Sequence, residues 1–397
     1  MNERKISDVF VSPRSTSFKC SNCSKGDAEN RCSRCTAVKY CSKECQKDHW
    51  VKHKTHCNEI KRRTKILAKE AETLRQFYEL EDLLPGSLFK VAIGIFWRLV
   101  EPRNYCKERL GLALKLRSCG MKNNSKLALE LSVEHMLDLI WLCRGDNLGV
   151  RLHIPSILCV LGEVQEAYDF LKWWQDRDLI SCCYDMKLPY CNLKGEDMYE
   201  SLSELKLSNH TDVHWYVDLF LIKYKLIRQL KLDKASYDAF LLGTDPKLGE
   251  DSPVMKLSGV WLALENIKEA IAPGMDKRIQ TLAIQLVALG KHIDKVNKFI
   301  IPGLLNSSVL LGQQTPQYVA AGTQNEAWNI VDYEHLNWKA TPNVLYFLKK
   351  LYIGMHGKRQ ALKNIKELPL MSVCYCCQCG CSDDESSDEE DMDDHEE

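Results

Sequence analysis

The residues best suited to chemistry lie within positions 20–57, where cysteines and histidines recur at short spacings. Thiolates and imidazoles are the ligands that Zn²⁺ prefers, and pairs of them two to four residues apart commonly present two ligands to one ion. Four such pairs supply eight ligands, which suffice for two closed four-ligand sites, and closed sites are structural. The candidate ligands are Cys20, Cys23, Cys32, Cys35, Cys41, Cys45, His53 and Cys57.

This segment has too few large apolar residues to fold by burial alone. Between Cys20 and Cys57 they are Val38, Tyr40, Trp50 and Val51. Metal binding must therefore supply the folding free energy. The alternatives are a disulfide framework or a redox pair of cysteines. Disulfides need an oxidising compartment, and the N-terminus lacks the apolar stretch of a secretory signal. The ligand spacing is therefore interpreted as a zinc site.

The order of these ligands, and the run YCSKECQKDHWVKHKTHC from Tyr40 to Cys57, resemble the MYND-type zinc finger. The spacing also leaves His49 and His56 open as ligands. The resemblance favours His53, and we expect His49 and His56 to be surface polar residues. It further implies two interleaved zinc ions, the first held by Cys20, Cys23, Cys41 and Cys45 and the second by Cys32, Cys35, His53 and Cys57.

The resemblance also implies a binding role, because fingers of this type grip short proline-containing peptides. Gln46 and Trp50 match the groove positions of the family, and a separation of four residues places them on one helix face. The alternative for Trp50 is packing inside the small domain, and one tryptophan can serve both purposes. We therefore expect Gln46 and Trp50 to form a peptide-binding site.

Charge is balanced over the 397 residues but unevenly distributed. Residues 1–65 carry 16 Lys and Arg against 7 Asp and Glu, whereas residues 382–397 carry 11 acidic residues and no Lys or Arg. Part of the positive charge near the finger offsets the ligating thiolates. Few aromatic residues interleave with it and no recognition helix stands out, so the pattern disfavours a nucleic-acid partner.

Nineteen cysteines without a secretory signal are typical of a reducing compartment, so we expect a cytoplasmic or nuclear protein. The longest apolar run, around Val91 to Trp97, is far shorter than the ~20 residues of a membrane span. The expected domains are a flexible N-terminus (1–19), the finger (20–57), a helical connector (58–82), an α-helical body (83–370) and a disordered tail (371–397).

The body shows the periodicity of amphipathic helices and few strand signals, which predicts a mainly α fold. Ser125 can cap one helix, and Gly162 can end another. The phrase DNLGVRLHIPSILCVLGEVQEAYDFL resembles a tetratricopeptide-like helical hairpin, although no clean 34-residue period surrounds it. Further helices are expected at 213–230, 260–270, 277–296 and 343–355.

The tail combines a cysteine cluster, Cys374 to Cys381, with the acidic run that follows it. The acidic run cannot bury a core and is expected to be disordered. The cysteines could bind soft metal, carry lipid or remain as reduced thiols.

Two functional classes fit these observations. The first is a zinc-binding adaptor that binds other proteins through short peptides. The alternative is a protein-lysine methyltransferase of the SET and MYND type. The methyltransferase is disfavoured because only 19 residues precede Cys20, and because Asn209–His210, the one Asn-His pair, leads into a helical pattern. No other catalytic motif stands out. Isolated histidines such as His214 are interpreted as structural, so neither an enzyme nor a small-molecule substrate is expected.

Overall fold

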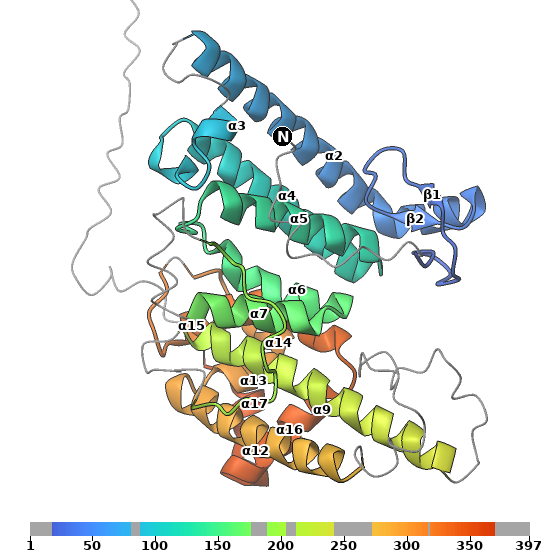
Figure 1. Ribbon diagram of the computed structural model, residues 1–397, viewed down its shortest axis with the longest axis vertical. Coiled ribbons are helices and arrows are strands. Elements are labelled where there is room, and N and C mark those ends of the chain that lie inside the picture. The colour runs from blue at the N-terminus through green and yellow to red at the C-terminus, as the bar shows by residue number, and fades with distance from the viewer. Residues whose placement is uncertain are drawn as a thin grey trace, which may run out of the picture.

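The computed structural model describes residues 18–80, 88–175, 189–203, 212–241, 272–316 and 318–369, and these residues are mainly helical (Figure 1). The predicted mainly α fold is confirmed. Two short strands in the finger, β1 (Asn30–Arg31) and β2 (Lys39–Tyr40), form the sheet of the described part. The helix predicted at 260–270, the cysteine cluster and the acidic tail lie outside the described residues.

The longer helices follow one another along the chain with short connections in most places. In order they are α2 (Lys43–Leu80), α4 (Pro102–Lys122), α5 (Lys126–Leu142), α6 (Ile154–Leu161), α7 (Val164–Gln175), α9 (Val213–Leu241), α12 (Ala272–Val296), α15 (Gln324–Ala340), α16 (Val344–His356) and α17 (Lys358–Lys366). The shorter ones are α3 (Leu88–Val91), η1 (Phe96–Arg98), η2 (Val150–His153), α13 (Ile300–Leu305) and α14 (Ser307–Leu311). None of the helices in the described ranges is long and apolar enough to cross a membrane.

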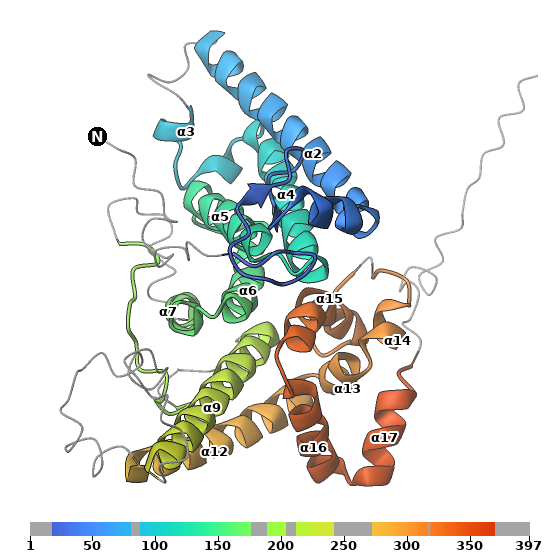
Figure 2. The same cartoon turned by 90° about the vertical axis from the view of Figure 1, so that its right-hand side faces the viewer.

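Helix α2 belongs to both the finger and the body, because it starts among the zinc ligands and continues unbroken along α4 (Figures 1 and 2). The Ser42 hydroxyl accepts a hydrogen bond from Cys45 N at 3.2 Å, which caps its first turn. Farther along, Arg63 pairs with Glu108 of α4 at 3.3 Å. The guanidinium lies against Gly111, where an added Cβ would come within 2.3 Å of Arg63 Nη1. Glycine at this position therefore leaves room for the Arg63 guanidinium against α4.

Consecutive helices of the body pack as pairs, α4 with α5, α6 with α7 and α9 with α12 (Figures 1 and 2). The predicted ends are confirmed at two places: Ser125 Oγ accepts from Ala128 N at the start of α5, and Gly162, with a φ of 94°, ends α6. Helices α13 to α17 form the remainder of the body beside α6 and α12, and side chains of α15 also meet α9. Trp338 of α15 is 1% exposed, as expected for a core residue.

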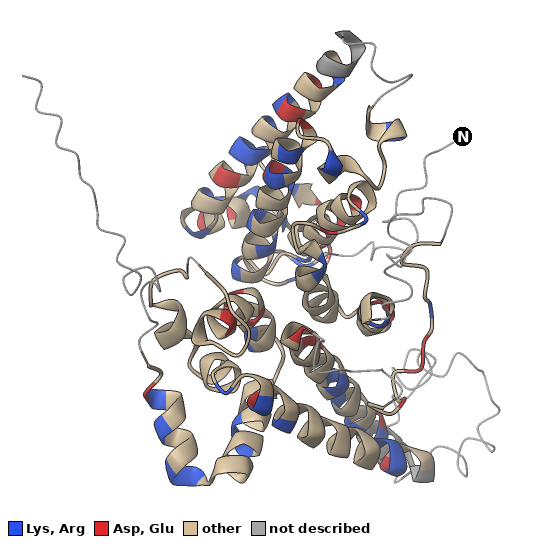
Figure 3. Cartoon of the chain, turned by 90° about the vertical axis from the view of Figure 1, so that its left-hand side faces the viewer, with Lys and Arg blue, Asp and Glu red and all other residues tan. Residues whose placement is uncertain are grey.

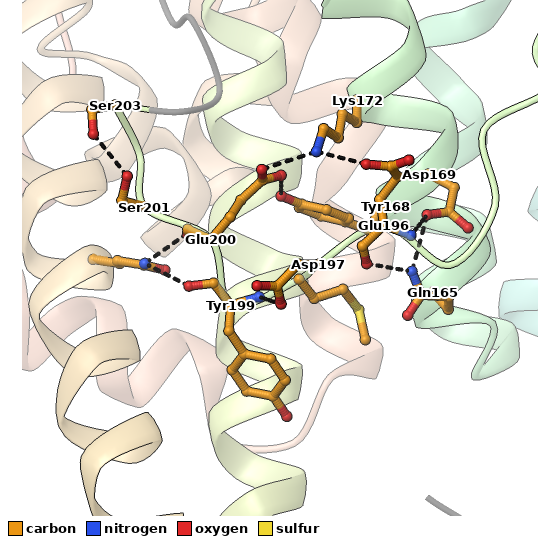
Figure 4. Close-up of polar contacts among 12 residues, drawn as sticks. Gln165, Tyr168, Asp169, Lys172, Glu196, Asp197, Tyr199, Glu200, Ser201 and Ser203 are labelled. Carbon is orange, nitrogen blue, oxygen red and sulfur yellow. Dashed lines mark hydrogen bonds and ion pairs between the residues drawn. The ribbon is translucent and has the colours of Figure 1, made fainter. Parts of the chain in front are cut away.

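Residues 189–203 cross from α7 toward α12 without regular structure and are held by polar contacts (Figure 4). Asp169 of α7 accepts hydrogen bonds from the backbone N–H groups of Gly195 and Glu196, at 2.8 and 2.9 Å. Lys172 pairs with Glu196 and with Glu200, at 2.7 and 2.9 Å. These contacts fix the segment against α7. No helix or strand signal in the sequence predicts this segment.

Candidate metal centre

Two tight turns present the first two cysteine pairs. Ser24 N donates to Cys20 O at 2.8 Å, and Thr36 N donates to Cys32 O at 2.9 Å, so each CxxC is closed by the same backbone hydrogen bond. Ser24 and Thr36 both have left-handed backbone, with φ of 60° and 56°. The closed turn brings the two sulfurs of each pair to one side, as a single ion requires.

The two-stranded sheet and α2 then bring distant ligands together. Arg31 pairs with Lys39 in the antiparallel register, so Cys32, directly after β1, and Cys41, directly after β2, lie at opposite ends of the sheet. Three ligands, Cys45, His53 and Cys57, come from α2, where the four-residue spacing of His53 and Cys57 stacks these two on one face. The chain thus alternates between two ligand clusters, as the cross-braced arrangement requires.

The first cluster contains Cys20, Cys23, Cys41 and Cys45, as predicted. The Sγ atom of Cys41 lies 3.6 Å from that of Cys23 and 3.5 Å from that of Cys45. A tetrahedral zinc with Zn–S bonds of about 2.3 Å sets its sulfurs roughly 3.8 Å apart, so the arrangement fits the ion closely. Burial alone would raise the pKa of Cys20, but backbone N–H groups of Cys23 and Cys41 outweigh it and lower the pKa to about 6. This thiolate is therefore available to metal near neutral pH.

The second cluster contains Cys32, Cys35, His53 and Cys57, all of them buried. The Cys32 and Cys57 sulfurs lie 3.7 Å apart, and Cys35 Sγ lies 3.4 Å from His53 Nε2. Burial, followed by the neighbouring His49, lowers the pKa of His53 to about 4, so its imidazole is neutral and able to ligate. Burial and the charge of Cys32 raise the pKa of Cys57 to about 11, so zinc must displace its proton. Both predicted sets of zinc ligands are thus confirmed.

The expected surface position of His49 is wrong. His49 is 4% exposed, its Nδ1 lies 3.1 Å from the Tyr40 hydroxyl, and its ring stacks on His53 at a centroid distance of 5.9 Å. It lies outside both ligand clusters and supports His53 by packing. His56 is half-buried, with Nε2 3.4 Å from the hydroxyl of Ser118 on α4. Ligand spacing could not predict either contact, because Tyr40 and Ser118 lie outside α2, the helix that carries His49 and His56.

The predicted peptide-binding residues lie on the first turns of α2, and both are half-buried. The ring of Trp50 meets that of His53 edge-on at 6.4 Å, and the Arg34 guanidinium lies 5.7 Å from its centroid. Trp50 therefore touches the second zinc cluster and also reaches the surface. The adjoining Val51 is 86% exposed.

The opposite side of the finger is fixed to the body. Val38, Tyr40 and Ile60 share one buried cluster with residues of α4 and α5. In addition, the hydroxyl of Ser125, the cap of α5, donates to Ala37 O at 2.8 Å. Ser125 thus satisfies the end of a body helix and a finger carbonyl at once. Finger and body share a core and do not form separate units joined by a linker.

We expect Co²⁺ titrated into the metal-free chain to give a sulfur-to-metal charge-transfer absorption that stops growing at two equivalents. Cys32→Ala should lower it by more than half, because each cluster braces the fold of the other. Cys119→Ala is the matched control, since this thiol is also fully buried beside the finger but lies outside both clusters. Loss of only half of the absorption in Cys32→Ala, with the other cluster intact, would contradict the interleaved arrangement.

Comparison with known proteins gives matches to the finger region. A model of the MYND finger family matches residues 20–57. The human histone-lysine N-methyltransferase SMYD1 is 41% identical over 83 residues, and mouse Smyd1 is 39% identical over 83 residues. These matches cover 21% of this chain and 13% of each relative, so the chain spans a small part of their length. No solved structure matches. By its ligands, its geometry and this match, the segment from Cys20 to Cys57 is a MYND finger that binds two zinc ions.

Proposed function

We propose that this protein is a zinc-dependent adaptor whose finger binds short proline-containing peptides while its helical body presents a second binding surface. The observation that carries the proposal is the position of Trp50. It is braced from within by His53 of the second zinc cluster, yet it remains partly exposed beside Val51. Tryptophan is one of the side chains enriched at the energetic centres of protein interfaces.

The docking of the finger supports the same function. Ala37, Val38 and Tyr40 contact the body, so the finger cannot rotate freely about α2. A peptide bound at Gln46 and Trp50 would consequently be held at a fixed position relative to the body. Fixed placement of two binding surfaces is what an adaptor in a regulatory complex needs, and it lowers the entropic cost of a second contact.

The charge on α2 favours a protein partner over nucleic acid. Basic and acidic residues share this helix (Figure 3), and Glu59 pairs with Arg62 and Arg63 at 2.8 and 3.1 Å. A phosphate-binding surface needs unneutralised Lys and Arg along one face. Part of the positive charge counted in the sequence is therefore already neutralised within the helix.

A reducing location in the cytoplasm or nucleus suits this proposal. None of the twelve cysteines in the described ranges forms a disulfide, and seven of them are zinc ligands. Two other cysteines, Cys106 and Cys143, are buried with their sulfurs 3.7 Å apart, and no disulfide joins them. Such a pair stays reduced in a compartment rich in thiol reductants.

Replacing Trp50 with alanine should weaken binding to proline-containing peptides, measured by fluorescence polarisation against a peptide panel. A loss of at least about tenfold is expected from removing an interface tryptophan. The cobalt–thiolate absorption at two equivalents should persist in Trp50→Ala. Val51→Ala is the control, because this neighbouring side chain points about 100° away around the helix. If the absorption disappears together with binding, Trp50 is a core residue and the peptide site lies elsewhere.

The similarity to SMYD1 raises a second candidate, a protein methyltransferase. The similarity covers 83 residues, which are 13% of that relative, so most of its length has no counterpart in the match. We propose that the chain is not a methyltransferase. Isothermal calorimetry of the full chain with S-adenosylmethionine should show no binding, and a micromolar dissociation constant would overturn this part of the proposal.

A further inference from the structure

Three side chains that commonly ligate metals meet in the interior of the body, far along the chain from the finger. His214 and Asp218 lie on α9, and Glu334 lies on α15. Each is 1% exposed or less, and their ligand atoms lie within 4.8 Å of one another. His214 and Asp218 are four residues apart, which places them on the same face of α9. The cluster thus joins two helices that are distant in sequence.

Asp218 lacks what a buried carboxylate normally has. Neither of its oxygens has a hydrogen-bond partner in the described part of the chain. By contrast, buried Asp146 accepts from the backbone N–H groups of Val150 and Arg151, at 2.8 and 3.0 Å. An unpaired buried carboxylate costs several kcal/mol unless a cation or a proton neutralises it. The Asp218 carboxylate therefore indicates a missing ligand.

Glu334 is oriented toward this position by its neighbours. Ser156 Oγ donates to Glu334 Oε1 at 2.9 Å, and Asn337 Nδ2 donates to Ser156 Oγ at 2.5 Å. His214 Nε2 lies 3.2 Å from Glu334 Oε1. An ion about 2 Å from each of two ligands separates them by roughly 3 to 4 Å, so this spacing suits a shared cation. A network that orients the ligands is also the usual surrounding of a bound metal.

The cations of the protein itself do not satisfy Asp218. Arg117 of α4 is 7% exposed and lies close enough for its charge to act on Glu334 and Asp218. Its Nε and Nη2 atoms nevertheless have no hydrogen-bond partner. One guanidinium charge also leaves one of the two carboxylates uncompensated. The ring of His153 lies tilted against that of Tyr333, with centroids 4.1 Å apart, and its Nδ1 has no hydrogen-bond partner either.

We propose that His214, Asp218 and Glu334 bind a third metal ion, a divalent cation such as Zn²⁺ or Mn²⁺. One imidazole and two carboxylates form a harder ligand set than the thiolates of the finger and suit both ions. Because all three side chains are buried, the ion acts as a structural cross-link between α9 and α15. It would hold the C-terminal helices against the middle of the body.

The test measures bound metal in the full chain after zinc reconstitution and desalting. Three zinc ions per chain are expected, two in the finger and one in the body. Asp218→Leu replaces a ligand with a larger apolar side chain that cannot bind metal, and should lower the content to two, with the cobalt–thiolate absorption unchanged. Asp233→Leu is the control, since Asp233 is also buried on α9 but lies outside the cluster. It should retain three ions.

A second measurement on the unsubstituted chain covers the case in which Asp218→Leu does not fold. The chain is loaded with two equivalents of zinc, which the thiolates take first, and Mn²⁺ is then followed by electron paramagnetic resonance. One tightly bound Mn²⁺ per chain is expected. Two zinc ions at saturation together with no bound Mn²⁺ would overturn the proposal and leave Asp218 neutralised by a proton. Three ions in both the unsubstituted chain and Asp218→Leu would also overturn it.

Discussion

Zinc coordination in residues 20–57 is the interaction on which the N-terminal half of the structure depends. The finger has only a small apolar core of its own. Its turns stay ordered because a metal ion links the ligands that they present. Once ordered, the finger buries Val38, Tyr40 and Ile60 against α4 and α5. The energy of metal binding is thereby coupled to the packing of the body.

The coupling has a structural cause in α2. The same helix supplies zinc ligands in its first turns and the Arg63 contact with Glu108 farther along. Because α2 is part of both the finger and the body, it fixes the position of the finger relative to the body. The surface around Trp50 is consequently presented in a defined direction, which is the property that the proposed adaptor function requires.

Local patterns sufficed to predict the finger and the helical class. Ligand spacing predicts the zinc sites because the two ligands of each pair lie within one turn of the chain. The helix ends at Ser125 and Gly162 follow from capping chemistry. The assignment of ligands to two ions came from resemblance to a known finger. The distances at Cys41 and His53 now support it independently.

Interactions between distant segments could not be predicted in this way. His49 is buried because Tyr40 and His53 enclose it, and the course of residues 189–203 depends on side chains of α7. The cluster at His214 shows the limit most clearly. His214 and Asp218 have the spacing of ligands on one helix, but that spacing is common, and Glu334 lies 120 residues from His214. Only the packing of α9 against the C-terminal helices brings the three together.

The coupling of finger and body is tested most directly by hydrogen exchange, followed by mass spectrometry, in the full chain and in Cys35→Ala. This substitution removes a zinc ligand from a loop and leaves α4 and α5 unchanged in sequence. We expect faster exchange in residues 20–57, in the part of α4 around Leu112 and Leu116, and in the first turn of α5. Protection in α16 should be unaltered. If α4 and α5 kept their full protection while the finger exchanged freely, the body would be independent of the zinc-bound finger, and the account would be wrong.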